Sequence, residues 1–209
     1  GIDHGVMLNL SQVYCNGWER QDAHDAIRWQ NDFNASIQER RPDKFTSGFV
    51  VQPLYLEDAL KEIERCVEQL KMPLLCLPTH FLNKEGEWLS VVDDRTEPIF
   101  ELASHYNLAM EIHPYDGEKM VKLKDVFWRF HLVWMMAQSA DALHMFTLKN
   151  IPNRFIKSFF SCLVEVDTNT YTYRSWSTQH TGLRGQHNFV QIDITLGIDL
   201  VLSQQLTLR

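Results

Sequence analysis

The chain has 209 residues, a length typical of one domain or of most of a larger one. A hydrophobic content of 44% is ordinary for a globular protein, and a net charge of −7 argues against a general nucleic-acid or anionic-membrane binder. No apolar stretch reaches the roughly 18–20 residues that cross a bilayer, and four dispersed cysteines suit reduced thiols. We therefore expect a soluble, cytoplasmic protein with neither nucleic-acid nor membrane partners.

In chain order, the first predicted strand covers residues 5–10 and leads through a polar loop to a helix over 22–40. Apolar residues recur along this helix at roughly helical spacing: Ala23, Ala26, Ile27, Phe33 and Ile37. Pro42 ends the helix, because proline cannot continue the ladder of backbone hydrogen bonds. A second strand is predicted over 45–54.

The next helix has the clearest periodicity in the chain. One stripe along it is apolar: Leu56, Ala59, Leu60, Ile63, Val67 and Leu70. Charged residues, Glu62 among them, cover the other side, so we expect an amphipathic helix with its apolar stripe against a core.

The third predicted strand, 74–77, is continuously apolar, which is typical of a parallel strand buried on both faces. A loop that contains Gly86 leads to a helix over 95–106, and residues 108–113 form the fourth strand. A helical stretch rich in methionine and aromatic residues follows over 121–148.

This alternation of strands and helices predicts an α/β fold with right-handed crossovers, either an open doubly wound sheet or part of a barrel. No Gly-x-Gly-x-x-Gly follows a strand, which weakens the dinucleotide-binding option. In both architectures the chemistry belongs at the carboxyl ends of the strands. The residues at those ends are Asn9, Ser11, Gln52, Thr79, His80 and His113.

Several short stretches stand in an order and spacing that point to a known family. They are Asn31-Asp32-Phe33, Arg41-Pro42-Asp43-Lys44-Phe45, residues 60–67, Thr79-His80, residues 111–116 and Asn153-Arg154-Phe155. Over about residues 5–155 the chain resembles the amidohydrolase-2 (amidohydrolase-related) family, most of all its decarboxylase branch. The resemblance implies a (β/α)8 TIM barrel of the metal-dependent hydrolase type with one divalent metal ion, usually zinc.

The resemblance also implies roles for particular residues. In such barrels the metal ligands are a His-x-His on the first strand, a histidine on a middle strand and an aspartate on the last strand. His113 matches the middle-strand ligand by its place in Ile-His-Pro. The chain contains no His-x-His, and Asp193 and Asp199 stay open as candidates for the aspartate.

The expected strand after Phe155 lacks the His-Gly-Gly that supplies the family's acid or base, so the catalytic residue stays unassigned. We expect an incomplete barrel without its N-terminal strand, and residues 1–155 as a partial barrel domain. Residues 156–209 would continue it with uncertain structure, and a shift out of register with the family is an open alternative.

Four residues are candidates for binding substrate. His80 follows a strand at the catalytic rim, where it would face substrate or bond the backbone. The family places an aromatic side chain from the segment around 127–136 against its planar substrate, and His131 and Trp134 match it within a residue or two; a core role competes. Trp18 lies on the loop after the first strand, where it would contact substrate or cap the core.

The predicted function is metal-dependent, non-oxidative decarboxylation of a small unsaturated or aromatic carboxylate. Hydrolysis of a small molecule in the same kind of barrel is the first alternative. The second is a catalytically incomplete fragment, because one ligand does not hold zinc. A homodimer is an open option.

Overall fold

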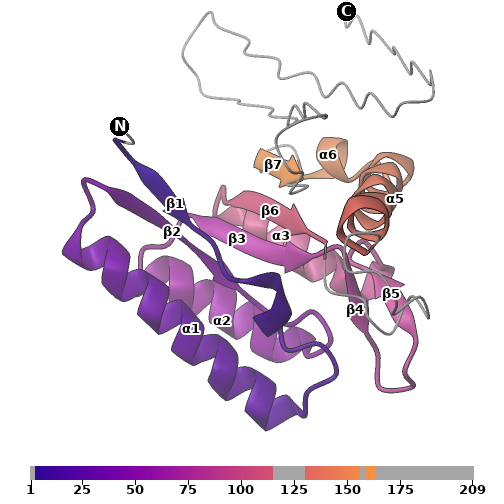
Figure 1. Ribbon diagram of the computed structural model, residues 1–209, viewed down its shortest axis with the longest axis horizontal. Helices are drawn as coiled ribbons and strands as arrows, with labels where there is room; N and C mark the ends of the chain where they lie inside the picture. The colour runs from indigo at the N-terminus through magenta and orange to yellow at the C-terminus, as the bar shows by residue number, and fades with distance from the viewer. Residues whose placement is uncertain (1–2, 115–129, 156–158, 163–209) are drawn as a thin grey trace, which may run out of the picture.

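A computed structural model describes residues 3–114, 130–155 and 159–162. Within this part five parallel strands form one curled sheet in the order β1-β2-β3-β6-β7 (Figure 1). The strands are β1 (Gly5–Met7), β2 (Phe45–Val50), β3 (Leu74–Pro78), β6 (Ala109–His113) and β7 (Phe159–Cys162). The predicted alternation of parallel strands and helices is confirmed, and β7 is the strand expected after Phe155.

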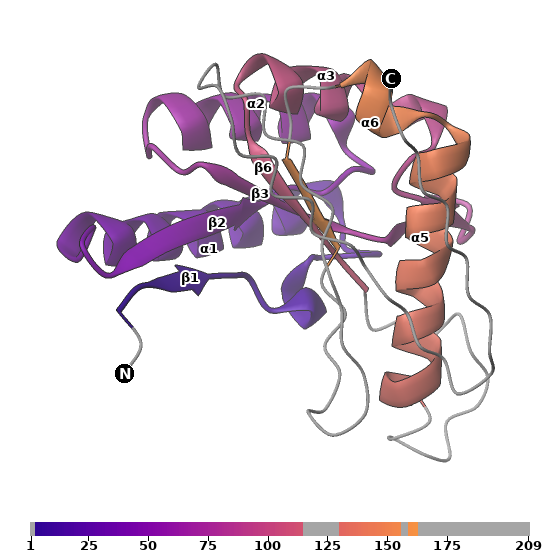
Figure 2. The ribbon, with the colours of Figure 1, turned by 90° about the horizontal axis from the view of Figure 1, so that it is seen from above.

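Helices α2 and α3 lie on one face of the sheet, α1 lies along β2, and α5 stands beside the carboxyl ends of β3 and β6 (Figure 2). The described helices are α1 (Arg20–Arg40), α2 (Leu56–Glu68), α3 (Glu97–His105), α5 (Met136–Leu148) and α6 (Ile151–Arg154). Short turns of other helix types occupy Ser11–Val13, Asp94–Thr96 and Phe130–Met135, the last being π-helical. The predicted helix over 121–148 is confirmed from Phe130 onward, and its earlier residues lie outside the described part.

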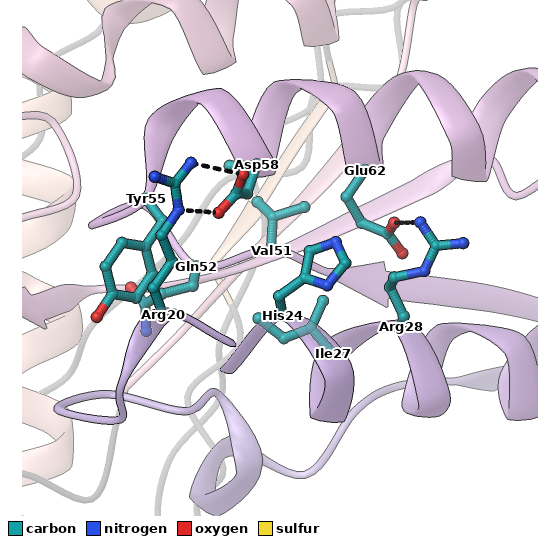
Figure 3. Close-up of a pocket in the computed structure, with 10 residues that line it drawn as sticks. Arg20, His24, Ile27, Arg28, Val51, Gln52, Tyr55, Asp58 and Glu62 are labelled. Atoms are coloured by element: carbon teal, nitrogen blue, oxygen red, sulfur yellow. Dashed lines mark hydrogen bonds and ion pairs between the residues drawn. The ribbon is translucent and has the colours of Figure 1, made fainter. Parts of the chain in front are cut away.

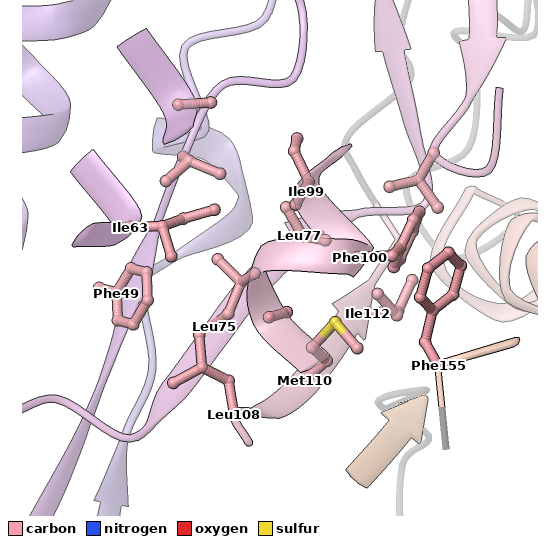
Figure 4. Packing of buried hydrophobic residues seen from close by; sticks show 14 of the residues in the cluster. Phe49, Ile63, Leu75, Leu77, Ile99, Phe100, Leu108, Met110, Ile112 and Phe155 are labelled. Atoms are coloured by element: carbon pink, nitrogen blue, oxygen red, sulfur yellow. The ribbon is translucent and has the colours of Figure 1, made fainter. Parts of the chain in front are cut away.

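The main core lies between the sheet and helices α2 and α3 (Figure 4). Alternate residues of the strands enter it, because successive side chains of a strand point to opposite faces. The central members are almost fully buried: Phe49, Leu75, Leu77, Met110 and Ile112 from the sheet, and Ile63, Ile99 and Phe100 from the helices. Phe155 stacks on Phe100 with ring centroids 6.0 Å apart, so α6 is anchored to the same core.

β1 ends three residues earlier than predicted, because α1 takes over the edge of β2. The Asn31 side chain accepts a hydrogen bond from the Val50 N–H at 2.9 Å and donates one to the Val50 carbonyl at 3.0 Å. Asn34 donates to the Gly48 carbonyl, also at 3.0 Å. Side-chain amides of a helix thus satisfy backbone groups that a longer β1 would have paired.

The same arrangement overturns one expectation about α1. Phe33 was expected on the buried stripe, but it is 52% exposed and stacks on the exposed Trp29. The side of α1 that faces the sheet carries Asn31 and Asn34 instead, since their amides are needed at the edge of β2.

Glu62 was expected on the solvated side of α2, and this expectation is also wrong. Its side chain is only 4% exposed. Asn31 donates to Glu62 Oε1 at 2.8 Å and Arg65 Nη2 donates to it at 2.7 Å. Burial of the carboxylate is tolerated because both neighbours hydrogen-bond to it.

A hairpin takes the place of the loop predicted around Gly86. β4 (His80–Leu82) pairs antiparallel with β5 (Trp88–Ser90). Gly86 has a φ of 82°, and the Asn83 side chain accepts a hydrogen bond from the Glu87 N–H at 2.7 Å. Glycine supplies the left-handed backbone and asparagine closes the turn, so the short strands pair without a long apolar run.

Some expectations lie outside the described residues. These are the register of 163–209, the Asp193 and Asp199 alternatives, and the division of the chain after residue 155. Among the residues that the structure describes, no helix combines the length and apolar character needed to cross a membrane.

Candidate functional site

The loops at the carboxyl ends of the strands converge on one rim. Gln52, after β2, donates to the Asn16 side-chain oxygen at 3.1 Å, and Asn16 donates to the His80 carbonyl at 3.4 Å. The Thr79 N–H donates to the carbonyl of His113 at 2.9 Å. Four segments that are distant in sequence are therefore tied together where parallel α/β folds place their chemistry.

His113 is the last residue of β6, beside Pro78 of β3, as the sequence predicts. Its Nδ1 lies 2.6 Å from the carbonyl oxygen of Pro114. A carbonyl only accepts, so Nδ1 carries the hydrogen and Nε2 carries the lone pair of the neutral ring. Histidines that bind metals commonly donate their second ring N–H to a carbonyl in this way.

The described residues alone do not fit a resident metal ion. Within residues 3–114, 130–155 and 159–162, no three His, Cys, Asp or Glu side chains gather closely enough to hold one. Zinc sites normally use three or four protein ligands. His113 has a tautomer common among ligands, but its companions would have to come from outside the described part.

His80 begins β4 and is held by α5. The residue is 8% exposed, and its Nε2 lies 3.0 Å from Asp141 Oδ2. One residue earlier, the Thr79 hydroxyl donates to Gln138 Oε1 at 3.3 Å. Burial lowers the pKa of His80, against an opposing effect of Asp141. Its role toward substrate stays a prediction.

Trp134 lies in the π-helical segment that precedes α5, one turn before Gln138. The side chain is partly buried, and its indole Nε1 is buried without a hydrogen-bond partner among the described residues. His131 belongs to the same segment, but its side chain lies outside what the structure describes. Contact of Trp134 or His131 with substrate stays a prediction.

Trp18 follows β1 on the loop that reaches the rim. The side chain is 46% exposed, and its backbone carbonyl accepts a hydrogen bond from the Tyr55 hydroxyl at 2.8 Å. With almost half its surface in solvent, Trp18 does not act as a buried cap on the core. Contact with substrate stays a prediction.

Glu111 is a buried acid on β6 that is not among the candidate site residues predicted from the sequence. It precedes His113 by two residues on β6, so both side chains project to the same face of the sheet. Glu111 is 2% exposed, and burial raises its pKa to about 7, against opposing hydrogen bonds from Cys76 and Tyr14. The sequence signal that could have indicated this buried acid is a single glutamate within the apolar run of residues 108–112.

A separate groove lies between α1 and α2 (Figure 3). Arg20 donates to Asp58 through Nε and Nη2 at 2.6 and 2.8 Å, and Arg28 lies 3.8 Å from Glu62. These ion pairs join the two helices across the groove. The groove therefore presents little unbalanced charge to a ligand.

No family model matches the chain. Three solved structures are similar to it in fold. The 2,6-dihydroxybenzoate decarboxylase from Rhizobium has a TM-score of 0.65 at 16% identity, over 77% of this chain and 51% of that one. A dihydroxybenzoic acid decarboxylase from Polaromonas sp. JS666, with bound manganese and 2-nitroresorcinol, has a TM-score of 0.65 at 17% identity, over 78% of this chain and 50% of that one. A protein described as amidohydrolase II has a TM-score of 0.64 at 16% identity, over 74% of this chain and 49% of that one.

The chain shares its fold with these proteins. It spans about half the length of each of them. At these identities the likeness concerns the fold alone, and the described residues of this chain form a curled parallel sheet of five strands within it.

Proposed function

We propose that this fold serves a metal-dependent, non-oxidative decarboxylase, a carboxy-lyase of a small unsaturated or aromatic carboxylate. The observation that carries the proposal is His113, which lies at the carboxyl end of β6 and has Nδ1 bonded to a carbonyl. The fold shared with two dihydroxybenzoate decarboxylases supports it. The finer likeness, to aminocarboxymuconate-semialdehyde decarboxylase, rests on the sequence stretches alone.

In the proposed reaction the bond between the substrate carbon and its carboxylate breaks and CO2 leaves. The electron pair stays on the carbon, which takes up a proton, so the reaction needs no oxidant. The polar rim around His80 and His113 would orient the carboxylate. We propose His113 as one ligand of a divalent ion, with its partners outside the described residues; zinc remains our prediction, although the Polaromonas enzyme holds manganese.

Two alternatives have specific support. The likeness to a protein described as amidohydrolase II favours hydrolysis in the same kind of barrel. The absence of three grouped ligands among the described residues favours a catalytically incomplete chain.

Metal content and CO2 release from 2,6-dihydroxybenzoate test the proposal together. We expect the purified chain to hold about one divalent ion, and His113→Ala to lower metal affinity and CO2 release by at least about ten-fold, because one ligand is lost. His144→Ala, at an exposed histidine of α5, is the matched control and should change neither.

A folded chain without metal that releases no CO2 would reject the decarboxylase and favour the incomplete chain. Retained metal with hydrolysis of an ester or amide probe, but no CO2, would favour the hydrolase instead.

A further inference from the structure

The hydrogen bonds of His80 determine which ring nitrogen carries the hydrogen. Its Nε2 faces Asp141 Oδ2 at 3.0 Å, and an ionised carboxylate can only accept. Nε2 therefore carries the hydrogen. In the neutral ring, which burial favours, Nδ1 is left as a lone-pair acceptor.

This acceptor has no hydrogen-bond partner among the described residues, although His80 is more than nine-tenths buried. A buried polar atom of this kind is costly unless a donor meets it, so a ligand that offers one binds with an advantage. Three residues of the adjoining helix, Trp134, Gln138 and Asp141, stand at spacings that share one face.

Two of these helix residues meet the segment that follows β3, since Gln138 bonds Thr79 and Asp141 bonds His80. The third, Trp134, has a buried indole N–H that lacks an acceptor among the described residues. Two buried groups are thus unmet among the described residues: an acceptor on β4, His80 Nδ1, and a donor in the segment before α5, Trp134 Nε1. A hydroxyl group can donate to the first, and a carboxylate can accept from the second.

We infer that His80 and Asp141 form a recognition pair, in which Asp141 orients the ring and His80 Nδ1 accepts a hydrogen bond from a hydroxyl group of the bound carboxylate. The inference rests on the proposed function for the identity of the site. A hydroxyl group suits this position better than an ammonium group, whose charge would lose its hydration on burial. Because Nδ1 is shielded from water, neighbouring side chains must shift for the hydroxyl group to reach it.

Binding measurements with the full chain test this inference without turnover. The probes are 2-, 3- and 4-hydroxybenzoate, each compared by calorimetry with its fluoro counterpart, which is similar in shape and cannot donate. We expect at least one hydroxy isomer to bind about ten-fold or more tightly than its counterpart. The preference should vanish in His80→Phe, weaken in Asp141→Asn and persist in His144→Phe.

Long-range proton–nitrogen spectra of histidine-labelled protein provide the second readout, one that a merely structural His80 would not move. We expect the Nε2–H form of His80, and a shift of the Nδ1 resonance when the preferred hydroxybenzoate is added. If His80→Phe does not fold, the affinity preference of Asp141→Asn and these spectra test the inference instead.

Equal affinity for both members of every pair, no binding of any probe, a preference that survives in a folded His80→Phe, or an Nδ1–H ring would each overturn the inference. Release of CO2 with equal affinities would overturn the recognition pair alone. A preference that depends on His80, without metal or CO2 release, would support the pair and reject the decarboxylase.

Discussion

At the scale of single residues, Glu111 is a carboxyl group buried inside the sheet. Its Oε2 lies 3.5 Å from the Tyr14 hydroxyl, which is the donor, while Oε1 is buried without a partner among the described residues. The phenol is affected in turn, because burial first and then the neighbouring carboxyl raise the pKa of Tyr14. The fold therefore favours the neutral form of the Glu111 carboxyl, and ionisation of this group opposes folding.

This environment makes stability depend on pH in a defined window. The carboxyl has an ordinary pKa of 4.5 and one of about 7 in the fold, so folding is favoured below 4.5 and loses that advantage as pH rises to 7. Glu111→Gln removes the dependence. Between pH 5 and pH 8 the free energy of unfolding of wild type should fall relative to the variant by about 2–3 kcal/mol.

Urea unfolding of both proteins at the two pH values measures this difference. Parallel pH profiles of wild type and Glu111→Gln would contradict the raised pKa.

At the scale of elements, the contact between α1 and β2 is made by polar side chains rather than by an apolar stripe. Asn31 bonds both backbone groups of Val50 and also Glu62 of α2, so one amide joins a helix, a strand and a second helix. Arg65 extends this network to Asp32 with a bond of 2.6 Å. Two helices are thereby held in register at the edge of the sheet.

Asn31→Ala should therefore lower the free energy of unfolding by more than the few atoms it removes would suggest. It leaves the N–H and carbonyl of Val50 and the buried carboxylate of Glu62 without this partner, and we expect a loss of about 2–4 kcal/mol in the free energy of unfolding. Glu39→Ala, at an exposed position of α1, is the control and should change it by less than about 0.5 kcal/mol. Urea unfolding decides, and a loss for Asn31→Ala no larger than that of the control would contradict the network.

At the scale of the whole molecule, the larger of the two apolar clusters among the described residues unites the sheet with α2, α3, α5 and α6. On the other side of the sheet, Val50 and Cys76 are buried in a second apolar cluster with side chains of α1 and of the loop before it, while Val6 at the edge strand β1 is 57% exposed. Burial on both faces at β2 and β3 is typical of a parallel sheet, and β1 is its exposed edge among the described strands.

The core makes a stability prediction for the whole domain. Leu75→Ala removes a fully buried side chain of β3 and should lower the free energy of unfolding by about 2–5 kcal/mol. Leu148→Ala makes the same chemical change at a residue that is 64% exposed and should cost less than about 0.5 kcal/mol. Similar losses for the two variants in thermal unfolding would show that β3 is not central to the core.

The sequence by itself determined the order of the main elements and the location of the rim. Continuous apolar runs and helical periodicity are local signals, so β3, α2 and β6 were predicted close to their observed bounds. The place of His113 at a strand end followed from the same signals. The likeness to an amidohydrolase-type fold came from short motifs in order.

Only the tertiary structure decided the polar contacts. Asn31 lies 19 residues from Val50 and 31 from Glu62, and His80 lies 61 residues from Asp141. Hydropathy patterns are local, so they do not reveal a hydrogen-bond partner that lies so far along the chain. Burial of Glu62 and Glu111, exposure of Phe33, and the orientation of the His80 ring therefore emerged only when the packed helices and strands brought these groups together.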